Sequence, residues 1–221
     1  MEEKANDYME KIKQIEEDRE MTIIMSNATE NPLNEQKANY LLKEMEYEKQ
    51  LLELKTDILE DTIEARETQS ELIKEHSDLG YDQEEHEEEL ENNKTMISTY
   101  QQEIEDAKVQ LKRNEAIQAH FREIDPSGIE NFEQYAIAYM SGIQEMSLEE
   151  IEDYDKYFEE YSNYVEKYGE GFNKEEVKEY IASYKDGISQ GKDREEINDN
   201  FYLQSTTINI GHSKDFNDEG R

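Results

Sequence analysis

The sequence predicts an all-α protein: an elongated helical hairpin or coiled coil, then a small acidic, Tyr-rich helical domain and a loose C-terminal tail. Good helix formers dominate, and the 221 residues include only 2 prolines and 9 glycines. Hydrophobic residues recur at helical spacing over long stretches, which argues against a disordered chain. Because 34% of the residues are hydrophobic and 37% are charged, thin helical packing is more favourable than a thick globular core.

Residues 1–33 are predicted to form an N-terminal amphipathic helix and a linker. The helix spans residues 2–25 and carries Tyr8, Ile12 and Ile15 on one face. The linker ends at Pro32, which disfavours helical dihedral angles at the preceding residue. An apolar cluster lies just before this linker, and such clusters at the ends of elements are usually core. We therefore expect the cluster, formed by residues 23–25, to pack against the hairpin.

Residues 34–124 are predicted to form a long helical hairpin with a turn near residues 77–82. The second arm carries a helix seam of residues seven apart, with a second row three positions further along: Leu90, Ile97, Ile104 and Leu111, then Asn93, Tyr100, Ala107 and Asn114. The two asparagines are expected to fix the register of the seam at a cost in stability. The first arm has two adjacent apolar rows, so we expect it to contact more than one helix, in a bundle or an oligomer.

An acidic run follows the predicted turn and forms the tip of the hairpin. Carboxylates are favoured at a helix N-terminus by the unpaired amides and the macrodipole, which accounts for several of them. The run exceeds what capping needs, so it is either solvated surface or a tip that meets a basic partner. The candidate partner-binding residues of this hairpin tip are Glu84, Glu85, Glu87, Glu88 and Glu91.

Residues 125–190 are predicted to form the acidic, Tyr-rich helical domain. The segment Asp125-Pro126-Ser127-Gly128 is a turn that marks its start. Residues 125–190 contain 17 acidic and 5 basic residues, a net charge of −12, and most of the 15 tyrosines of the chain. A first helix is expected over 129–140, ended by the glycine of Ser141-Gly142. A capping box formed by Ser147 and Glu150 begins the next helix, which ends at Gly169.

That second helix, residues 147–168, is the most informative one for function. One face carries Ile151, Phe158 and Val165 at a spacing of seven, with three tyrosines alongside, and the opposite face is polar and mainly negative. The tyrosines are either core, with hydroxyls at the rim, or an interface that receives Arg and Lys. We expect the seam residues to be core and the flanking tyrosines to be exposed. The candidate partner-binding residues of this helix are Glu149, Glu152, Asp153, Asp155, Tyr157, Glu159, Glu160 and Tyr164.

The C-terminal part is predicted to hold one more helix and a tail. Asn173 can cap a helix over residues 174–185, which Asp186-Gly187 and Gln190-Gly191 are expected to end. Residues 191–221 are polar and are expected to form a loose tail. Residues 205–211 have β character, so one short strand there is a further possibility.

The net charge of −34 constrains the partners. Such a field repels nucleic acid and anionic membranes and attracts basic surfaces, so we expect a protein partner with a basic surface, no direct nucleic-acid binding and no membrane insertion. Homo-oligomers are expected from the two apolar rows of the first hairpin arm, not from the charge. Glycine-rich phosphate loops, nucleophile motifs and metal-ligand spacings are missing, which predicts no catalytic residues, no cofactor and no metal site. Without a signal-like or spanning apolar segment, or any cysteine, a cytoplasmic protein is expected, in a host cytoplasm or a virion if a phage encodes it.

Two functional hypotheses follow. The first is a non-enzymatic structural, assembly or adaptor protein that acts through protein–protein contacts. In composition and periodicity, though in no motif, the chain resembles phage and secretion-associated coiled-coil proteins. The second is an acidic nucleic-acid mimic that blocks a basic DNA- or RNA-binding surface, for example that of a host defence nuclease.

Overall fold

In this computed structural model the described residues, 2–78, 83–169 and 171–212, form helices joined by short connections. No strand occurs within those ranges, so the predicted all-α class is confirmed for the described part of the chain. The chain divides into two compact units, Met1–Ile124 and Asp125–Arg221.

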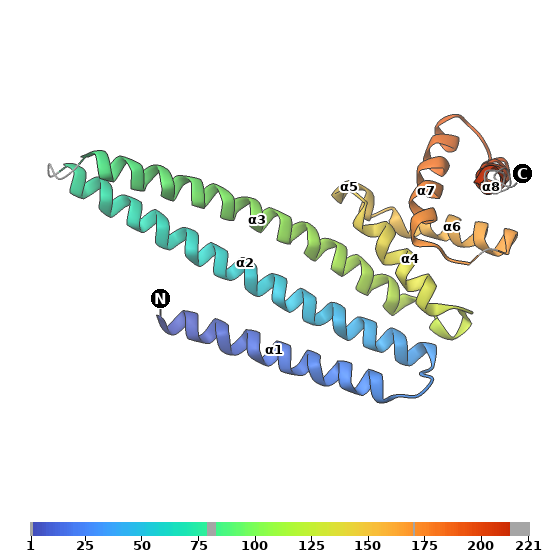
Figure 1. Cartoon of the computed structure of the whole chain (residues 1–221), viewed down its shortest axis with the longest axis horizontal. Helices are drawn as coiled ribbons and strands as arrows, with labels where there is room; N and C mark the ends of the chain where they lie inside the picture. The colour runs from blue at the N-terminus through green and yellow to red at the C-terminus, as the bar shows by residue number, and fades with distance from the viewer. Residues whose placement is uncertain (1, 79–82, 170, 213–221) are drawn as a thin grey trace, which may run out of the picture. The chain divides into compact units, whose positions relative to one another are not determined.

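In unit 1, residues 1–124, the described residues form three long helices that lie side by side (Figure 1). They are α1 (Glu2–Ala28), α2 (Asn34–Asp78) and α3 (Gln83–Glu123). The 45 residues of α2 span roughly 70 Å at a rise of about 1.5 Å per residue. Of the turn predicted near 77–82, residues 77 and 78 are the last of α2, and residues 79–82 lie outside the described residues. Both α1 and α3 pack against α2, which is therefore the central helix of the unit.

Helices α2 and α3 run antiparallel along the row of residues that the sequence marks as a seam. Lys49 of α2 pairs with Glu115 of α3, whereas Gln69, further along α2, hydrogen-bonds to Glu89, nearer the start of α3, which establishes that direction. Ile104 and Ala107 are buried in the contact. The other apolar seam residues are half-buried: Leu90, Ile97, Tyr100 and Leu111.

Two buried asparagines of α3 form polar layers in this contact. Asn93 is only 2% exposed; Arg66 Nη1 donates to its Oδ1 at 2.8 Å, and its Nδ2 donates to the Ser70 hydroxyl at 3.2 Å. Asn114 donates to the backbone carbonyl of Met45 at 2.9 Å. Each layer is satisfied in one register only, because a shifted α3 would leave a buried amide unpaired.

Helix α1 packs on a second row of α2, distinct from the row that faces α3. Tyr8 donates to Asp61 at 2.9 Å, and the Thr22 and Tyr47 hydroxyls lie 3.0 Å apart. The face of α1 that meets α2 therefore consists of residues seven apart, among them Tyr8 and Thr22. Ile23, Ile24 and Met25 lie off that face and are 44%, 51% and 55% exposed, so the prediction that they pack against the hairpin is wrong.

In unit 2, residues 125–221, the described residues form helices shorter than those of unit 1 (Figure 1), and several of them begin at local side-chain caps. Its elements are η1 (Pro126–Gly128), α4 (Phe132–Gln144), α5 (Leu148–Ile151), α6 (Tyr154–Tyr168), α7 (Lys174–Ser189) and α8 (Arg194–His212). The predicted caps at Ser147 and Asn173 are confirmed: the Ser147 N–H donates to Glu150 at 3.0 Å, and Asn173 accepts from the Glu175 N–H at 2.9 Å. Gly169 ends α6 with a left-handed φ of 69°, as predicted.

Two glycines that were expected to end helices lie inside them instead. A Cβ on Gly142 would lie 2.0 Å from the Tyr154 hydroxyl oxygen, and a Cβ on Gly187 would lie 2.5 Å from Ile197 Cγ1. Helices α4 and α7 continue through these positions, because each glycine admits a side chain from another helix rather than breaking its own. The prediction of one helix over 147–168 is also wrong, because a turn at residues 152–153 separates α5 from α6.

The tail predicted as loose, with a possible strand over 205–211, is helical as far as His212. Ile197 and Phe201, four residues apart on one face of α8, are both buried. The Phe201 ring lies 5.3 Å from that of Tyr180 of α7 and 5.2 Å from that of Tyr164 of α6. Burial of this helical face outweighs the β propensity of the segment that follows, because propensity is the weaker effect. Residues 213–221 lie outside the described residues.

The core of unit 2 is largely aromatic. The ring of Phe158 lies 5.2 Å from that of Tyr135 and 5.0 Å from that of Tyr139, both of α4. Tyr164 and Tyr180 extend the same cluster toward α8, with ring centroids 5.2 Å apart. Edge-to-face rings bury a large area per residue, so a small and highly charged unit can hold a fixed structure.

Candidate protein-interaction surfaces

The first candidate surface is the outer face of α5 and α6, which the aromatic core holds from behind. Most of the carboxylates predicted to contact a partner are exposed there: Glu149, Glu152, Asp153, Asp155 and Glu159. Four of them, which we call the carboxylate row, form no ion pair with any described residue: Glu149, Glu152, Asp153 and Glu159. The row is therefore a fixed patch of uncompensated negative charge.

Three other residues predicted for this surface have different surroundings. Glu160 is half-buried and pairs with Arg194 of α8 at 2.6 Å. Tyr157 is half-buried beside Lys185, whose Nζ lies 4.6 Å from the ring centroid. Tyr164 is 0% exposed in the aromatic core, so its prediction as an exposed, partner-binding residue is wrong. The seven-residue pattern could not place Tyr164, because α7 and α8 cover the face on which it lies.

Several of the buried tyrosines hydrogen-bond to groups within unit 2. The Tyr139 hydroxyl donates to Asp155 at 2.6 Å, and the Tyr154 hydroxyl donates to the Tyr139 carbonyl at 2.9 Å. The Tyr180 hydroxyl donates to the Asn198 side chain at 2.6 Å. Burial, together with the nearby negative charge of Asp155, raises the pKa of Tyr135 to about 12. Burial likewise raises the pKa of Tyr180 above its ordinary value, so these rings serve as neutral core.

An ion pair fixes the start of the carboxylate row against α7. Lys185 Nζ lies 2.5 Å from Glu150, whose carboxylate also accepts from the Ser147 N–H and hydroxyl. The Lys185 hydrogen bond, followed by those from Ser147, lowers the pKa of Glu150 to about 2. Since Glu150 is ionised and held in place, the short helix α5 presents its neighbours Glu149 and Glu152 at a defined position.

The second candidate surface lies at the distal end of the α2–α3 pair, where the sequence predicted an acidic tip. Glu87, Glu88 and Glu91 are exposed on the first turns of α3. The side chains of Glu84 and Glu85, predicted with them, lie outside the described residues. Glu91 pairs with Lys94 at 3.6 Å on the same helix, so its charge is partly compensated.

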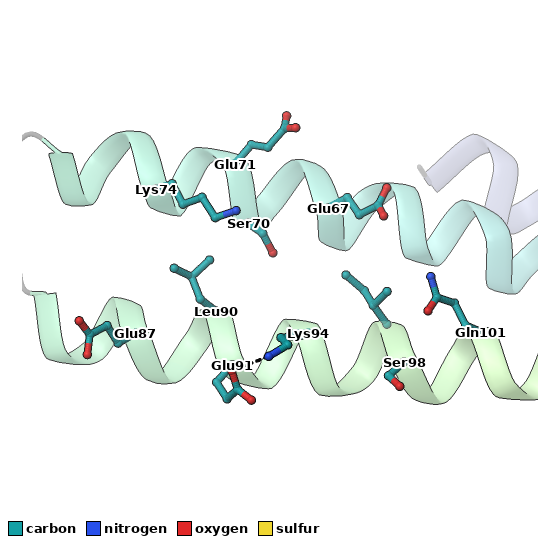
Figure 2. A pocket seen from close by; sticks show the side chains of 11 residues that line it. Glu67, Ser70, Glu71, Lys74, Glu87, Leu90, Glu91, Lys94, Ser98 and Gln101 are labelled. Carbon is teal, nitrogen blue, oxygen red and sulfur yellow. Dashed lines mark ion pairs between the residues drawn. The ribbon is translucent and has the colours of Figure 1, made fainter.

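Between the two helices at this end lies a groove of about 1000 Å³ (Figure 2). Leu90 of α3 and Ser70 of α2 point toward each other across it (Figure 2), and Ile97 of α3 also lines it. The rest of the lining is charged or polar: Glu67, Glu71, Lys74, Glu87, Glu91, Lys94, Ser98 and Gln101. The groove exists because the serine is too small to cover the two apolar residues, whereas Ile104, one heptad further along the row, is buried.

Sequence reasoning identified the α3 side of this groove but not the α2 side. The acidic run indicated Glu87 and Glu91, and the seven-residue spacing of the seam indicated Leu90 and Ile97. Glu67, Glu71 and Lys74 are ordinary charged residues of a long helix, and no local pattern distinguishes them. The available signal was the serine at position 70, a small polar residue in the row that faces α3.

The chain matches no protein-family model, and neither a curated protein nor a solved structure is significantly similar to it. Among the described residues, no helix is long and apolar enough to cross a membrane. The same residues contain no group of three or more His, Cys, Asp or Glu side chains arranged to hold a metal ion.

Proposed function

We propose that this protein is a non-enzymatic, acidic α-helical structural, assembly or adaptor protein that acts through protein–protein contacts. The carboxylate row on α5 and α6 carries the proposal, because its charges are exposed, unpaired with any described residue and held by a rigid aromatic core. A fixed acidic patch accelerates association with a basic surface and needs little reordering on binding. The expected partner is a protein with a basic surface, and its binding should weaken as salt increases.

A second candidate function is the acidic mimic of a nucleic acid, and the same row favours it. The row and the neighbouring Asp155 place five exposed carboxylates between Glu149 and Glu159. Duplex DNA likewise presents closely spaced negative charges, about one per 1.7 Å of its axis. An adaptor needs no such match, and we therefore rank it first.

The test is affinity capture from the native host with the full chain and two charge-reversed variants. The first variant carries Glu149→Lys, Glu152→Lys and Glu159→Lys. The matched control carries Glu130→Lys, Glu179→Lys and Glu195→Lys, which makes the same charge change at exposed positions of unit 2 outside the row. The proposal expects specific partners that the first variant loses and the control retains, with helical circular dichroism unchanged in both.

Two outcomes would count against the ranking or the proposal. If duplex DNA displaces the captured partner competitively, the mimic becomes the better explanation. If both variants capture the same proteins as the unchanged chain, the carboxylate row is solvated surface and the proposal fails.

A further inference from the structure

We propose that the groove at the distal end of α2 and α3 binds one basic amphipathic helix of a partner protein. This inference rests on the proposed function only in that the chain acts through protein contacts; it concerns unit 1 and does not require the carboxylate row. Four observations carry it: the apolar floor, the hydrogen-bonded layer beneath it, the charges on the walls and the length of the groove.

The floor offers two apolar contacts at helical spacing. Leu90 and Ile97 are half-buried and lie on one row of α3, one heptad apart, which is about 10 Å along the axis. An incoming helix with apolar residues at positions i and i+7 can contact both at once. Covering them removes apolar surface from water, which favours binding. Packing of α2 on α3 alone leaves these two side chains only half-buried.

Two polar side chains beneath the floor, Ser70 and Asn93, already have hydrogen-bond partners, whereas Arg66 Nε of the same layer has none. The Ser70 hydroxyl accepts from Asn93 at 3.2 Å and donates to the Arg66 carbonyl at 2.8 Å. An apolar side chain placed over them therefore leaves no new unsatisfied buried group. This layer also fixes the register of α2 and α3, so the groove is formed before a partner arrives.

The charges on the walls of the groove favour a positively charged partner. Four glutamates and two lysines line the groove, and Glu67, Glu71 and Glu87 form no ion pair with any described residue (Figure 2). Glu67 and Glu71 are four residues apart on one wall, and Glu87 and Glu91 are four apart on the other. Lysines or arginines at i and i+4 of a partner helix have the same spacing.

The overall charge opposes a second copy of this chain as the occupant. Each copy carries a net charge of −34, so two copies repel as they approach. Every helix of unit 1 is itself acidic in sum, so none of them supplies the basic flanks that the walls match. A foreign basic helix satisfies both the floor and the walls.

The lining residues set the length of the occupant. They run from Glu87 to Gln101 along α3, about 21 Å at helical rise, which corresponds to about four turns of a partner helix. The groove lies on a different face of α2 from the row that meets α1: Asp61 contacts α1, and Glu67 lies about 120° further around the helix. Helix α1 therefore leaves the groove open.

The probe for the test is a labelled synthetic helix of four turns with two leucines seven residues apart and lysines at the flanking positions. Its matched control peptide has the same composition with the leucines on opposite faces. Binding to the full chain is measured by fluorescence anisotropy at low and moderate salt. The proposal expects the first peptide to bind and the control peptide to bind at least tenfold more weakly.

Two variants of the full chain locate the binding site. The double variant Glu71→Lys and Glu87→Lys should weaken binding of the first peptide about tenfold, because two exposed favourable charge contacts become repulsive. Glu75→Lys with Glu88→Lys is the matched control, since both residues are exposed near the same end and do not line the groove, and it should change the affinity less than threefold. Circular dichroism confirms that both variants remain helical.

The proposal is overturned if neither peptide binds, if the two bind alike or if both variants weaken binding equally, because charge alone then accounts for the result. It is also overturned if light scattering shows a dimer that Ile97→Glu dissociates while the peptide fails to bind, because the groove then belongs to a second copy. If the peptide does not bind but capture still depends on the carboxylate row, the groove proposal fails and the proposed function stands. If capture does not depend on the row, the proposed function fails whatever the peptide does.

Discussion

The hydroxyl of Tyr154 lies in the space that a side chain on Gly142 would fill. A Cβ at Gly142 would be 2.0 Å from that oxygen, which donates a 2.9 Å hydrogen bond to the Tyr139 carbonyl. Tyr154 is fully buried, so its ring has little room to move away. The contact places the start of α6 directly against α4.

Gly142→Ala should lower the free energy of unfolding of unit 2 by about 1–3 kcal/mol. Alanine favours a helix interior by about 1 kcal/mol, but overpacking a closed contact costs more when the tyrosine must also give up its hydrogen bond. Urea denaturation followed by the near-ultraviolet dichroism of the tyrosines measures the change. Gly128→Ala, where a Cβ would meet nothing within 4 Å, is the control and should shift the midpoint very little. Equal stability of the two variants would contradict the close contact.

Asn93→Ala should destabilise unit 1 by about 1–2 kcal/mol, because Arg66 and Ser70 lose their hydrogen-bond partner and a cavity forms. Thermal melting of the helical dichroism provides the measurement. Asn92→Ala, at the exposed neighbouring position, is the matched control and should be neutral or slightly stabilising. The same loss in both variants would mean that the buried layer contributes nothing beyond helix propensity.

The Glu150–Lys185 pair should make unit 2 acid-sensitive. The pKa of Glu150 is lowered from 4.5 to about 2, so its contribution is complete above the higher value and is lost as pH falls through the lower one. The side chains are 40% and 30% exposed, and solvent screening limits the contribution to about 1 kcal/mol.

Melting temperatures of the unchanged chain and of Glu150→Gln test this. The variant should melt lower at neutral pH, and the gap should close as the pH approaches about 2. Glu149→Gln, which removes an exposed carboxylate without an ion partner, is the control and should show no such gap. A gap that is constant with pH would contradict the ionic origin of the effect.

Alkaline titration should separate the buried tyrosines from the exposed ones. Burial raises the pKa of Tyr135 to about 12 and raises that of Tyr139 further, with Asp155 adding to both shifts. Because the folded-state pKa is the higher one, this stabilisation is complete below the ordinary value near 10 and is lost as pH rises through about 12. Tyrosinate absorbance should therefore rise in two steps, the second together with loss of helix.

Tyr135→Phe should reduce the amplitude of that second step by one tyrosine. A single step involving all 15 tyrosines, with the helices intact, would contradict an aromatic core closed to hydroxide.

The helix ends show how far local sequence carries a prediction. The caps at Ser147 and Asn173 and the left-handed Gly169 were predicted from the sequence, since each involves atoms only a few residues apart. Gly142 and Gly187 look similar to Gly169 in sequence but lie within helices, because Tyr154 and Ile197 approach them from elsewhere in the chain. No window around either glycine contains that information.

The candidate surfaces divide in the same way. The exposed carboxylates of the row could be predicted, because charged residues on the polar face of an amphipathic helix remain in water. Tyr164 could not be placed, since its burial depends on α7 and α8, and the groove could not be found, since it requires Ser70 of α2 to lie beside Leu90 and Ile97 of α3.

The sequence by itself determined the helical class, the caps and the sign of the surface charge, because propensity, short hydrogen bonds and ionisation act over one or two turns. Tertiary structure alone decided which glycines accommodate a neighbour, which tyrosines are core, that residues 205–212 are helical and where a groove opens. The physical reason is that excluded volume and apolar burial depend on the residue lying opposite, and that residue can be tens of positions away along the chain.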